Sequence, residues 1–173
     1  MCVLIEAINV IIRQDAIERS YPGGMVGYEF DCPNPTYCAD MDIVRVGFMS
    51  PYDVQRWVAE LEKHSIILLQ ERQCIDIAVV DQVRGPTAPC DWLEFGRQPE
   101  GYTVAWLKGT VPHEIAVPKG WNVENSLSRN YRFIPTAEIK TAVKYGGREG
   151  NLDIFTDPKT GEKLYMGRPP WKD

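Results

Sequence analysis

The sequence predicts an α+β protein with a mainly antiparallel sheet, helices on one face of it, and an irregular C-terminal extension. Strand-like and helix-like segments alternate over the first part of the chain in an order typical of a ferredoxin-like or βαβββ-type core. This regular patterning weakens after residue 110. We therefore expect a core domain over 1–110 and an extension over 111–173 that packs on the core or on a partner subunit.

The N-terminal elements follow from residue type. Residues 3–12 are rich in Val and Ile, and both of their alternating faces are largely apolar, which predicts a strand covered on both sides or lining a cavity. Residues 14–20 predict a short helix that ends at Tyr21-Pro22-Gly23-Gly24. Met25 to Phe30 is then a second expected strand. Residues 31–42 form a loop, since their two prolines prevent a regular ladder.

The clearest helix follows the strand predicted at 43–49. Ser50 is a favourable N-cap, Pro51 suits the first helical position, and Asp53 complements the helix N-terminus. Apolar residues then recur with helical spacing and form one buried stripe: Val54, Trp57, Val58 and Leu61. The helix is expected to end near His64 or Ser65.

The later elements are shorter. Four further strands are predicted, at 66–70, 75–82, 91–97 and 102–107. Beyond them the chain is expected to be mostly irregular, with a short helix at 136–145 that stops at Gly146. Residues 157–161, Asp-Pro-Lys-Thr-Gly, predict a hairpin turn.

Composition excludes several classes of protein. Apolar residues make up 44% of the 173 residues and charged residues 25%, which is typical of a globular chain. The net charge is -5 and the basic residues are dispersed, so nucleic acid is not an expected partner. No apolar run approaches the roughly 18 residues of a membrane helix. Five cysteines and an N-terminus unlike a secretory signal favour a cytoplasmic location.

Motifs for the common catalytic sites are absent. The sequence has no phosphate-binding Gly-rich loop, no Gly-x-Ser-x-Gly elbow and no His-Glu-x-x-His. The loop at 31–42 contains Cys32 and Cys38 among three aspartates, which leaves open a zinc site, a redox pair or ordinary thiols, with ordinary thiols favoured. A thiol activated by His64 or His113 is a further alternative. We expect no cofactor and no metal.

Charged residues within predicted strands are the stronger candidates for a site. Glu6, Arg45, Asp76 and Glu94 all lie in strands, where a charge is costly unless it is paired or faces water or a ligand. Glu6 and Arg45 could pair or bind a polar ligand if they share a sheet face. We take Glu6, Arg45, Glu94 and the loop residue His113 as candidate ligand-binding residues.

The order of elements at 43–97 is strand, helix and three strands, and it ends in Asp91-Trp92-Leu93-Glu94-Phe95. This order resembles half of a vicinal-oxygen-chelate (glyoxalase-like) module and covers under a third of the chain. In that family a glutamate near the end of such a strand is commonly a metal ligand, so the resemblance implies this role for Glu94. The sequence departs from the family at Arg45, where a histidine would be expected.

Two functions follow from these observations. The first is a non-catalytic α+β protein that binds a small molecule or a protein partner, with the long extension wrapping a neighbour in a homodimer. The alternative is an enzyme with a sheet-lined polar pocket built from Glu6, Arg45 and Glu94, metal-assisted and vicinal-oxygen-chelate-like.

Overall fold

A five-stranded antiparallel sheet forms the centre of the protein in the computed structural model, which describes residues 1–126, 143–149 and 152–167. Its strand order is β3-β4-β2-β7-β8. The middle strand β2 (Ile8–Arg13) pairs along its length with β4 (Ile43–Phe48) and β7 (Ile77–Asp81). The short edge strands are β3 (Cys38–Ala39) and β8 (Gly85–Pro86).

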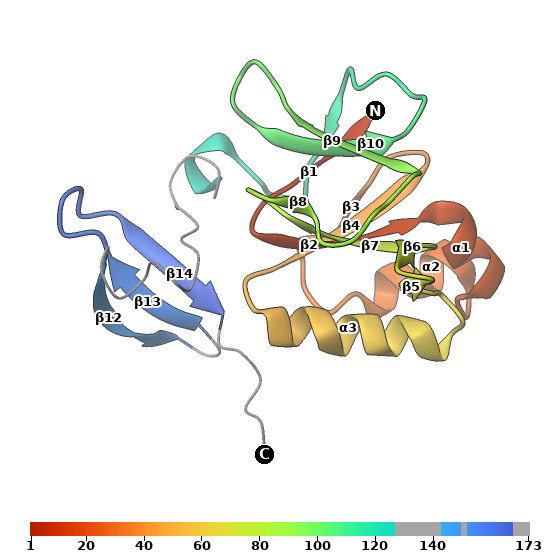
Figure 1. Cartoon of the computed structure of the whole chain (residues 1–173), viewed down its shortest axis with the longest axis horizontal. Helices are drawn as coiled ribbons and strands as arrows, with labels where there is room; N and C mark the ends of the chain where they lie inside the picture. Colours follow the sequence, from red (N-terminus) through yellow and green to blue (C-terminus); the bar gives the residue numbers. More distant parts are fainter. Residues whose placement is uncertain (127–142, 150–151, 168–173) are drawn as a thin grey trace.

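Three helices cover one face of this sheet: α1 (Gln14–Ser20), α2 (Gly24–Asp31) and α3 (Pro51–Lys63) (Figure 1). The apolar cluster between helices and sheet takes Val10 and Ile12 from β2 and Val44 and Val46 from β4. Helix α3 contributes the stripe Val54, Trp57, Val58 and Leu61, all buried. Burial of such a stripe against a sheet supplies the main driving force for packing this layer.

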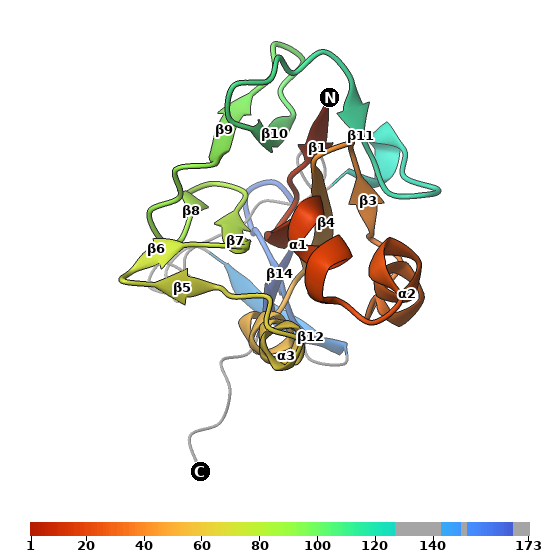
Figure 2. The same ribbon diagram turned by 90° about the vertical axis from the view of Figure 1, so that its right-hand side faces the viewer.

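A second sheet packs on the opposite face, with the order β11-β1-β10-β9. Its strands are β1 (Cys2–Leu4), β9 (Leu93–Arg97), β10 (Thr103–Leu107) and β11 (Ile115–Ala116). In the turned view of Figure 2, β9, β10 and β11 again lie across the five-stranded sheet from α3. A separate apolar cluster fills the space between the sheets and includes Val3, Ile11, Ala78 and Ala105.

The remaining elements are small. Strands β5 (Leu69–Gln70) and β6 (Gln73–Cys74) form a two-stranded ribbon, and Val123–Asn125 form one 3-10 turn, η1. In the C-terminal part, β12 (Lys144–Glu149), β13 (Leu152–Thr156) and β14 (Lys163–Gly167) form an antiparallel sheet. Asp157 holds the turn between β13 and β14, since its side chain accepts from the Lys159 N–H and its carbonyl from the Gly161 N–H.

The α+β class predicted from the sequence is confirmed, and so are the helices expected at 14–20 and after Ser50. The turn at 157–161 is confirmed as well. Ser50 occupies the N-cap position of α3, although its side chain makes no capping hydrogen bond. Within the described residues, no helix is both long and apolar enough to cross a membrane.

The strand expected at Met25–Phe30 is wrong, because these residues lie in helix α2. Met25 and Tyr28, three residues apart, pack on the core, whereas Phe30 is exposed. Gly27 makes this helix possible, since a Cβ there would lie 1.9 Å from the Pro22 carbonyl oxygen. A close approach of this kind depends on the fold, and a local preference for strand does not reveal it.

The continuous strand expected at 3–12 is divided between two sheets. Ala7 adopts a left-handed backbone conformation with φ of 55°, which bends the chain from β1 into β2. Its N–H donates to the Gln82 side chain over 2.8 Å, and this contact holds the bend.

The helix expected at 136–145 is wrong at its C-terminal end, since Lys144 and Tyr145 belong to β12. Residues 136–142 of this expected helix lie outside the described residues.

Candidate functional site

A cavity of about 630 Å³ opens where β2 begins and β4 ends. Its walls come from the bend at Glu6 and Ala7, the loop at 34–36, and the segment at 118–121. Glu149 and Leu152 of the C-terminal sheet close another side. The volume falls within the roughly 300–1,000 Å³ typical of small-molecule sites.

Arg45 lies at the floor of this cavity with only 2% of its surface exposed. Its Nε donates to the Asn9 side-chain oxygen over 2.6 Å, and its Nη1 to the Thr36 carbonyl over 2.9 Å. Its Nη2 donates to the Glu6 carbonyl over 3.3 Å. Burial lowers the pKa of the guanidinium, an effect that the neighbouring Cys38 and Glu6 oppose. The charge is thus held in place by oriented oxygens that are themselves uncharged.

Glu6 is also buried, and its carboxylate holds the segment after β11 against the core. One carboxylate oxygen accepts from the Ser126 hydroxyl over 2.6 Å and from the Trp121 indole N–H over 3.4 Å. The Glu6 N–H donates to the Asn9 side-chain oxygen over 3.4 Å, the same oxygen that accepts from Arg45. Asn9 in turn donates to the Val80 carbonyl over 3.2 Å, so the network is anchored on β7.

The structure therefore brings Glu6 and Arg45 together, on the face of the central sheet that is turned away from the helices. The hydrogen bond between them runs from Arg45 Nη2 to the Glu6 carbonyl oxygen, and no ion pair joins the two side chains among the described residues. The Asn9 side-chain oxygen accepts from both the Arg45 guanidinium and the Glu6 backbone N–H, so it joins the guanidinium to the backbone at Glu6. A polar group entering the cavity would meet both a buried carboxylate and a buried guanidinium.

Gly47 provides the room that the Arg45 side chain occupies. It lies two residues further along β4, on the same face, and a Cβ there would lie 2.5 Å from Arg45 Nη2. The Thr36 hydroxyl accepts from the Gly47 N–H over 2.7 Å and donates to the Gly47 carbonyl over 3.1 Å. These contacts fix the loop at 34–36 against the end of β4.

Glu94 and His113 are not brought to this cavity. Glu94 lies on β9 of the second sheet, where its carboxylate accepts from the Trp106 indole N–H over 2.7 Å. Strands β4 and β7 belong to the other sheet, so the segment at 43–97 does not form one continuous sheet. His113 lies in an exposed loop with its Nδ1 2.9 Å from the Val111 carbonyl oxygen.

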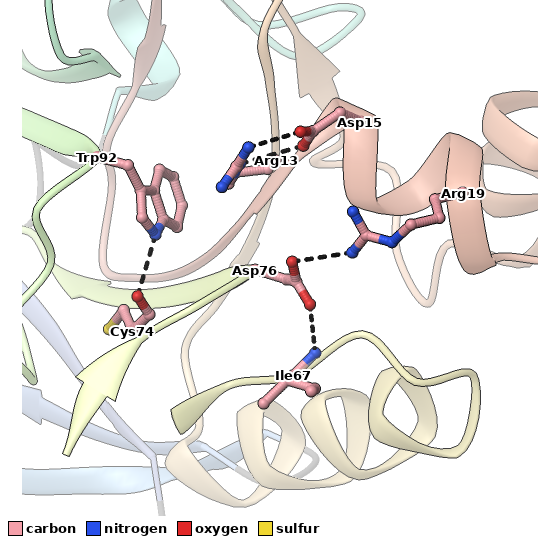
Figure 3. Close-up of polar contacts among 7 residues, drawn as sticks. All are labelled: Arg13, Asp15, Arg19, Ile67, Cys74, Asp76 and Trp92. Atoms are coloured by element: carbon pink, nitrogen blue, oxygen red, sulfur yellow. Dashed lines mark hydrogen bonds and ion pairs between the residues drawn. The ribbon is translucent and has the colours of Figure 1, made fainter. Parts of the chain in front are cut away.

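Asp76 has a structural environment. It is buried just before β7 and accepts from Arg19 of α1 over 3.1 Å and from the Ile67 N–H over 2.9 Å (Figure 3). The carboxylate thereby ties helix α1 to the chain that leaves α3. Asp76 is thus paired inside the protein and does not face water.

The cysteines of the 31–42 loop are separated by the central sheet. Cys32 packs against the helix-side cluster, whereas Cys38 belongs to the cluster between the sheets. Burial raises the pKa of Cys32 to about 12 and also raises the pKa of Cys38, although Arg45 opposes the latter shift. Across residues 1–126, 143–149 and 152–167, no three His, Cys, Asp or Glu side chains gather in a way that could hold a metal ion. His64, which the sequence offered as a base that could activate a thiol, packs its ring on Tyr21, with the two ring centroids 4.8 Å apart.

Asn9 of β2 was missed as a site residue from the sequence, and so were two further residues of this site, Ser126 and Thr36. Both lie in irregular chain, where no periodic pattern marks a position as buried. Trp121 carried a weak signal, because Trp is enriched at binding sites.

A comparison of the chain with models of protein families, with curated protein sequences and with solved structures finds no significant match.

Proposed function

We propose that the protein is a non-catalytic binding protein whose cavity over Glu6 and Arg45 takes one small amphipathic molecule. The observation that carries this proposal is that a buried carboxylate and a buried guanidinium both line the cavity, each held by neutral partners. Buried charges are costly, and a site that keeps both in fixed positions can orient a polar head group.

The walls above these charges suit the remainder of such a ligand. Phe48, Met49, Trp121 and Leu152 offer apolar surface, while Lys119 contributes a cationic group and Asp53 and Glu149 contribute carboxylates. A ligand with a charged or dipolar head and an apolar body would match both regions. Trp121 takes part in both, because its indole N–H contacts Glu6 and its ring lines the cavity.

The scaffold is consistent with a binding role. The elements of the central layer, β2, α1 with α2, β3, β4, α3 and β7, occur in the β-α-β-β-α-β order of ferredoxin-like proteins, with the β5–β6 ribbon inserted between α3 and β7, and we propose this topology for the layer. Fold alone does not define function, so the proposed role rests on the cavity. The homodimer, a protein partner and the cytoplasmic location stay predictions from the sequence.

The enzyme alternative needs Glu94 to join Glu6 and Arg45. Glu94 instead pairs with Trp106 on β9 and is not among the residues that line the cavity. We therefore favour binding over metal-assisted chemistry of the vicinal-oxygen-chelate type.

The proposal is tested with anilinonaphthalene sulfonate, a fluorescent dye that combines an anionic head with an apolar body. We expect saturable binding to one site on the full chain. Met49→Trp and Leu152→Trp fill the cavity from two sides, and each should weaken binding by more than about tenfold. The matched control is Val83→Trp, which adds the same bulk at an exposed turn outside the cavity.

If the dye binds the two cavity variants as tightly as it binds wild type and Val83→Trp, the cavity is not the binding site. Far-ultraviolet circular dichroism of each variant shows whether the fold is retained. Because the two substitutions lie on different elements, one can fail to fold without removing the test.

A further inference from the structure

Two cysteines that are distant from the cavity lie next to each other. Cys74 ends β6, and Cys90 lies just before β9. The Cys74 N–H donates over 2.8 Å to the carbonyl of Pro89, the residue directly before Cys90. The backbone at Cys74 is therefore hydrogen-bonded to the peptide unit that leads into Cys90. The Trp92 indole N–H donates to the Cys74 carbonyl over 3.3 Å (Figure 3). This second hydrogen bond also holds the segment at 89–92 against Cys74.

The side chains of this pair point into the same apolar cluster, the one between the two sheets. Cys74 is buried and Cys90 is half-buried, and both thiols are free. Burial raises the pKa of Cys74 to about 12, with a further increase from the adjacent Cys90 thiol. Burial likewise raises the pKa of Cys90, and its contact with Cys74 acts in the opposite direction. The two thiols therefore share one apolar environment, beside the backbone hydrogen bond that joins their segments.

We propose that Cys74 and Cys90 form a disulfide by exchange with a low-molecular-weight disulfide such as glutathione disulfide. A backbone hydrogen bond between these segments favours a disulfide, which requires the two Cα atoms to lie within about 7 Å of each other. The bond would join the β5–β6 ribbon to the chain that enters β9. It would thus link two parts of the protein that belong to different sheets.

The exchange proceeds in two balanced steps. Cys90, the more accessible thiol, loses its proton and attacks one sulfur of glutathione disulfide, which forms a mixed disulfide and releases one glutathione thiolate. Cys74 then loses its proton and attacks the Cys90 sulfur, which releases the second glutathione. Two protein thiols are oxidised to one disulfide, one glutathione disulfide is reduced to two thiols, and the protons pass to the departing thiolates.

Mass spectrometry of the full chain tests this pairing. The protein is incubated with glutathione disulfide, its remaining thiols are alkylated after unfolding, and it is digested with trypsin without reduction. Cleavage after Arg72, Arg84 and Arg97 places the two cysteines in separate peptides, Gln73–Arg84 and Gly85–Arg97. We expect these peptides to appear joined, with loss of both alkylated forms. The proposal would be overturned if both peptides were still found in their alkylated forms under conditions that oxidise Cys32 or Cys38.

Variants assign the order of attack. In Cys74→Ser, the glutathione adduct should remain on Cys90, because no second thiol displaces it. In Cys90→Ser, Cys74 should carry little adduct, since its side chain is buried. Cys32→Ser is the control and should leave the joined peptides unchanged. Joined peptides that contain Cys90 and any cysteine other than Cys74 would also refute the pairing, and this readout on the wild-type chain does not depend on any variant folding.

Discussion

The Arg45 guanidinium donates from Nε to the Asn9 side-chain oxygen over 2.6 Å, and this hydrogen bond joins β4 to β2 on the buried face between the two sheets. Asn9 and Arg45 are not opposite neighbours in the ladder, because Asn9 is paired with Gly47. The contact is therefore diagonal, and the absence of a side chain at position 47 allows it. One small residue thus decides whether a buried cation can be accommodated.

Replacing Arg45 by methionine is expected to destabilise the protein. Methionine keeps much of the volume but leaves the Asn9 side-chain oxygen and the Thr36 and Glu6 carbonyls without this donor. Buried acceptors that lose their donor cost about 1–3 kcal/mol each, and the Asn9 oxygen retains the Glu6 N–H, so we expect a total loss of about 3 kcal/mol. Urea denaturation followed by circular dichroism measures the change.

The matched control is Arg13→Met. Arg13 pairs with Asp15 at the surface, with 37% of its side chain exposed, and such pairs contribute about 0–1 kcal/mol. A loss at Arg45 no greater than the loss at Arg13 would show that the buried network does not stabilise the fold.

Gly47→Ala tests the space reserved for the guanidinium. The new Cβ would lie 2.5 Å from Arg45 Nη2 and 2.9 Å from its Cζ, so the guanidinium must move. Overpacking of this kind costs about 1–3 kcal/mol, and dye binding at the cavity should weaken along with stability. Gly146→Ala is the control, because a Cβ there meets its nearest neighbour at an ordinary 3.5 Å. Equal stability of the two variants would contradict the tight fit at Gly47.

The sequence was most informative where one element alone determines the pattern. The stripe of α3 and the turn at 157–161 have local causes, helical spacing and turn chemistry, and both were predicted. The conformation of Met25–Phe30 depends instead on how closely Gly27 can approach Pro22, a tertiary contact. The bend at Ala7 has no sequence signal, since alanine is not a residue that favours positive φ.

The same distinction holds for the site. Glu6 and Arg45 could be selected because a charge within an apolar strand needs a partner. The partners themselves, Ser126 and Thr36, come from irregular chain and are placed by the fold. Glu94 satisfied the same criterion as Glu6, but its strand belongs to the second sheet, and its partner Trp106 is a simple cross-strand neighbour. A charged residue in a predicted apolar strand can be identified as a site candidate from the sequence. Which candidates lie close together depends on the sheet to which each strand belongs.

Asp76 and Arg19 provide a third prediction. Asp76→Ala leaves the Ile67 N–H without its acceptor and should cost about 2 kcal/mol. Arg19→Met removes a donor whose side chain is 58% exposed and should cost less than about 1 kcal/mol. A double-mutant cycle measured by urea denaturation then yields a small coupling energy between the two side chains. A coupling that accounts for most of the Asp76 loss would show that the ion pair, rather than the Ile67 contact, provides the stability.

The last prediction concerns alkaline pH. Burial raises the pKa of Cys32 from 9.0 to about 12, and it raises the pKa of Tyr21 from 10.0 to about 12, helped by the hydrogen bond to Asp31. Both groups are neutral when protonated, so a raised pKa means that the folded state retains protons that the unfolded state releases. The unfolded state then binds fewer protons, and stability falls as pH rises. The contribution of these groups is complete below about pH 9 and is lost progressively toward pH 12.

Cys32→Ala and Tyr21→Phe each remove one of these groups, so each should make the decline of the unfolding free energy above pH 9 shallower than in wild type. Denaturant titrations at a series of alkaline pH values measure the slope, and absorbance of the ionised tyrosines follows Tyr21 directly. The comparison depends on slopes, so a variant that is less stable at neutral pH remains informative. Parallel curves for wild type and both variants would mean that neither group resists ionisation in the folded protein, because a group with the same pKa in both states contributes no slope.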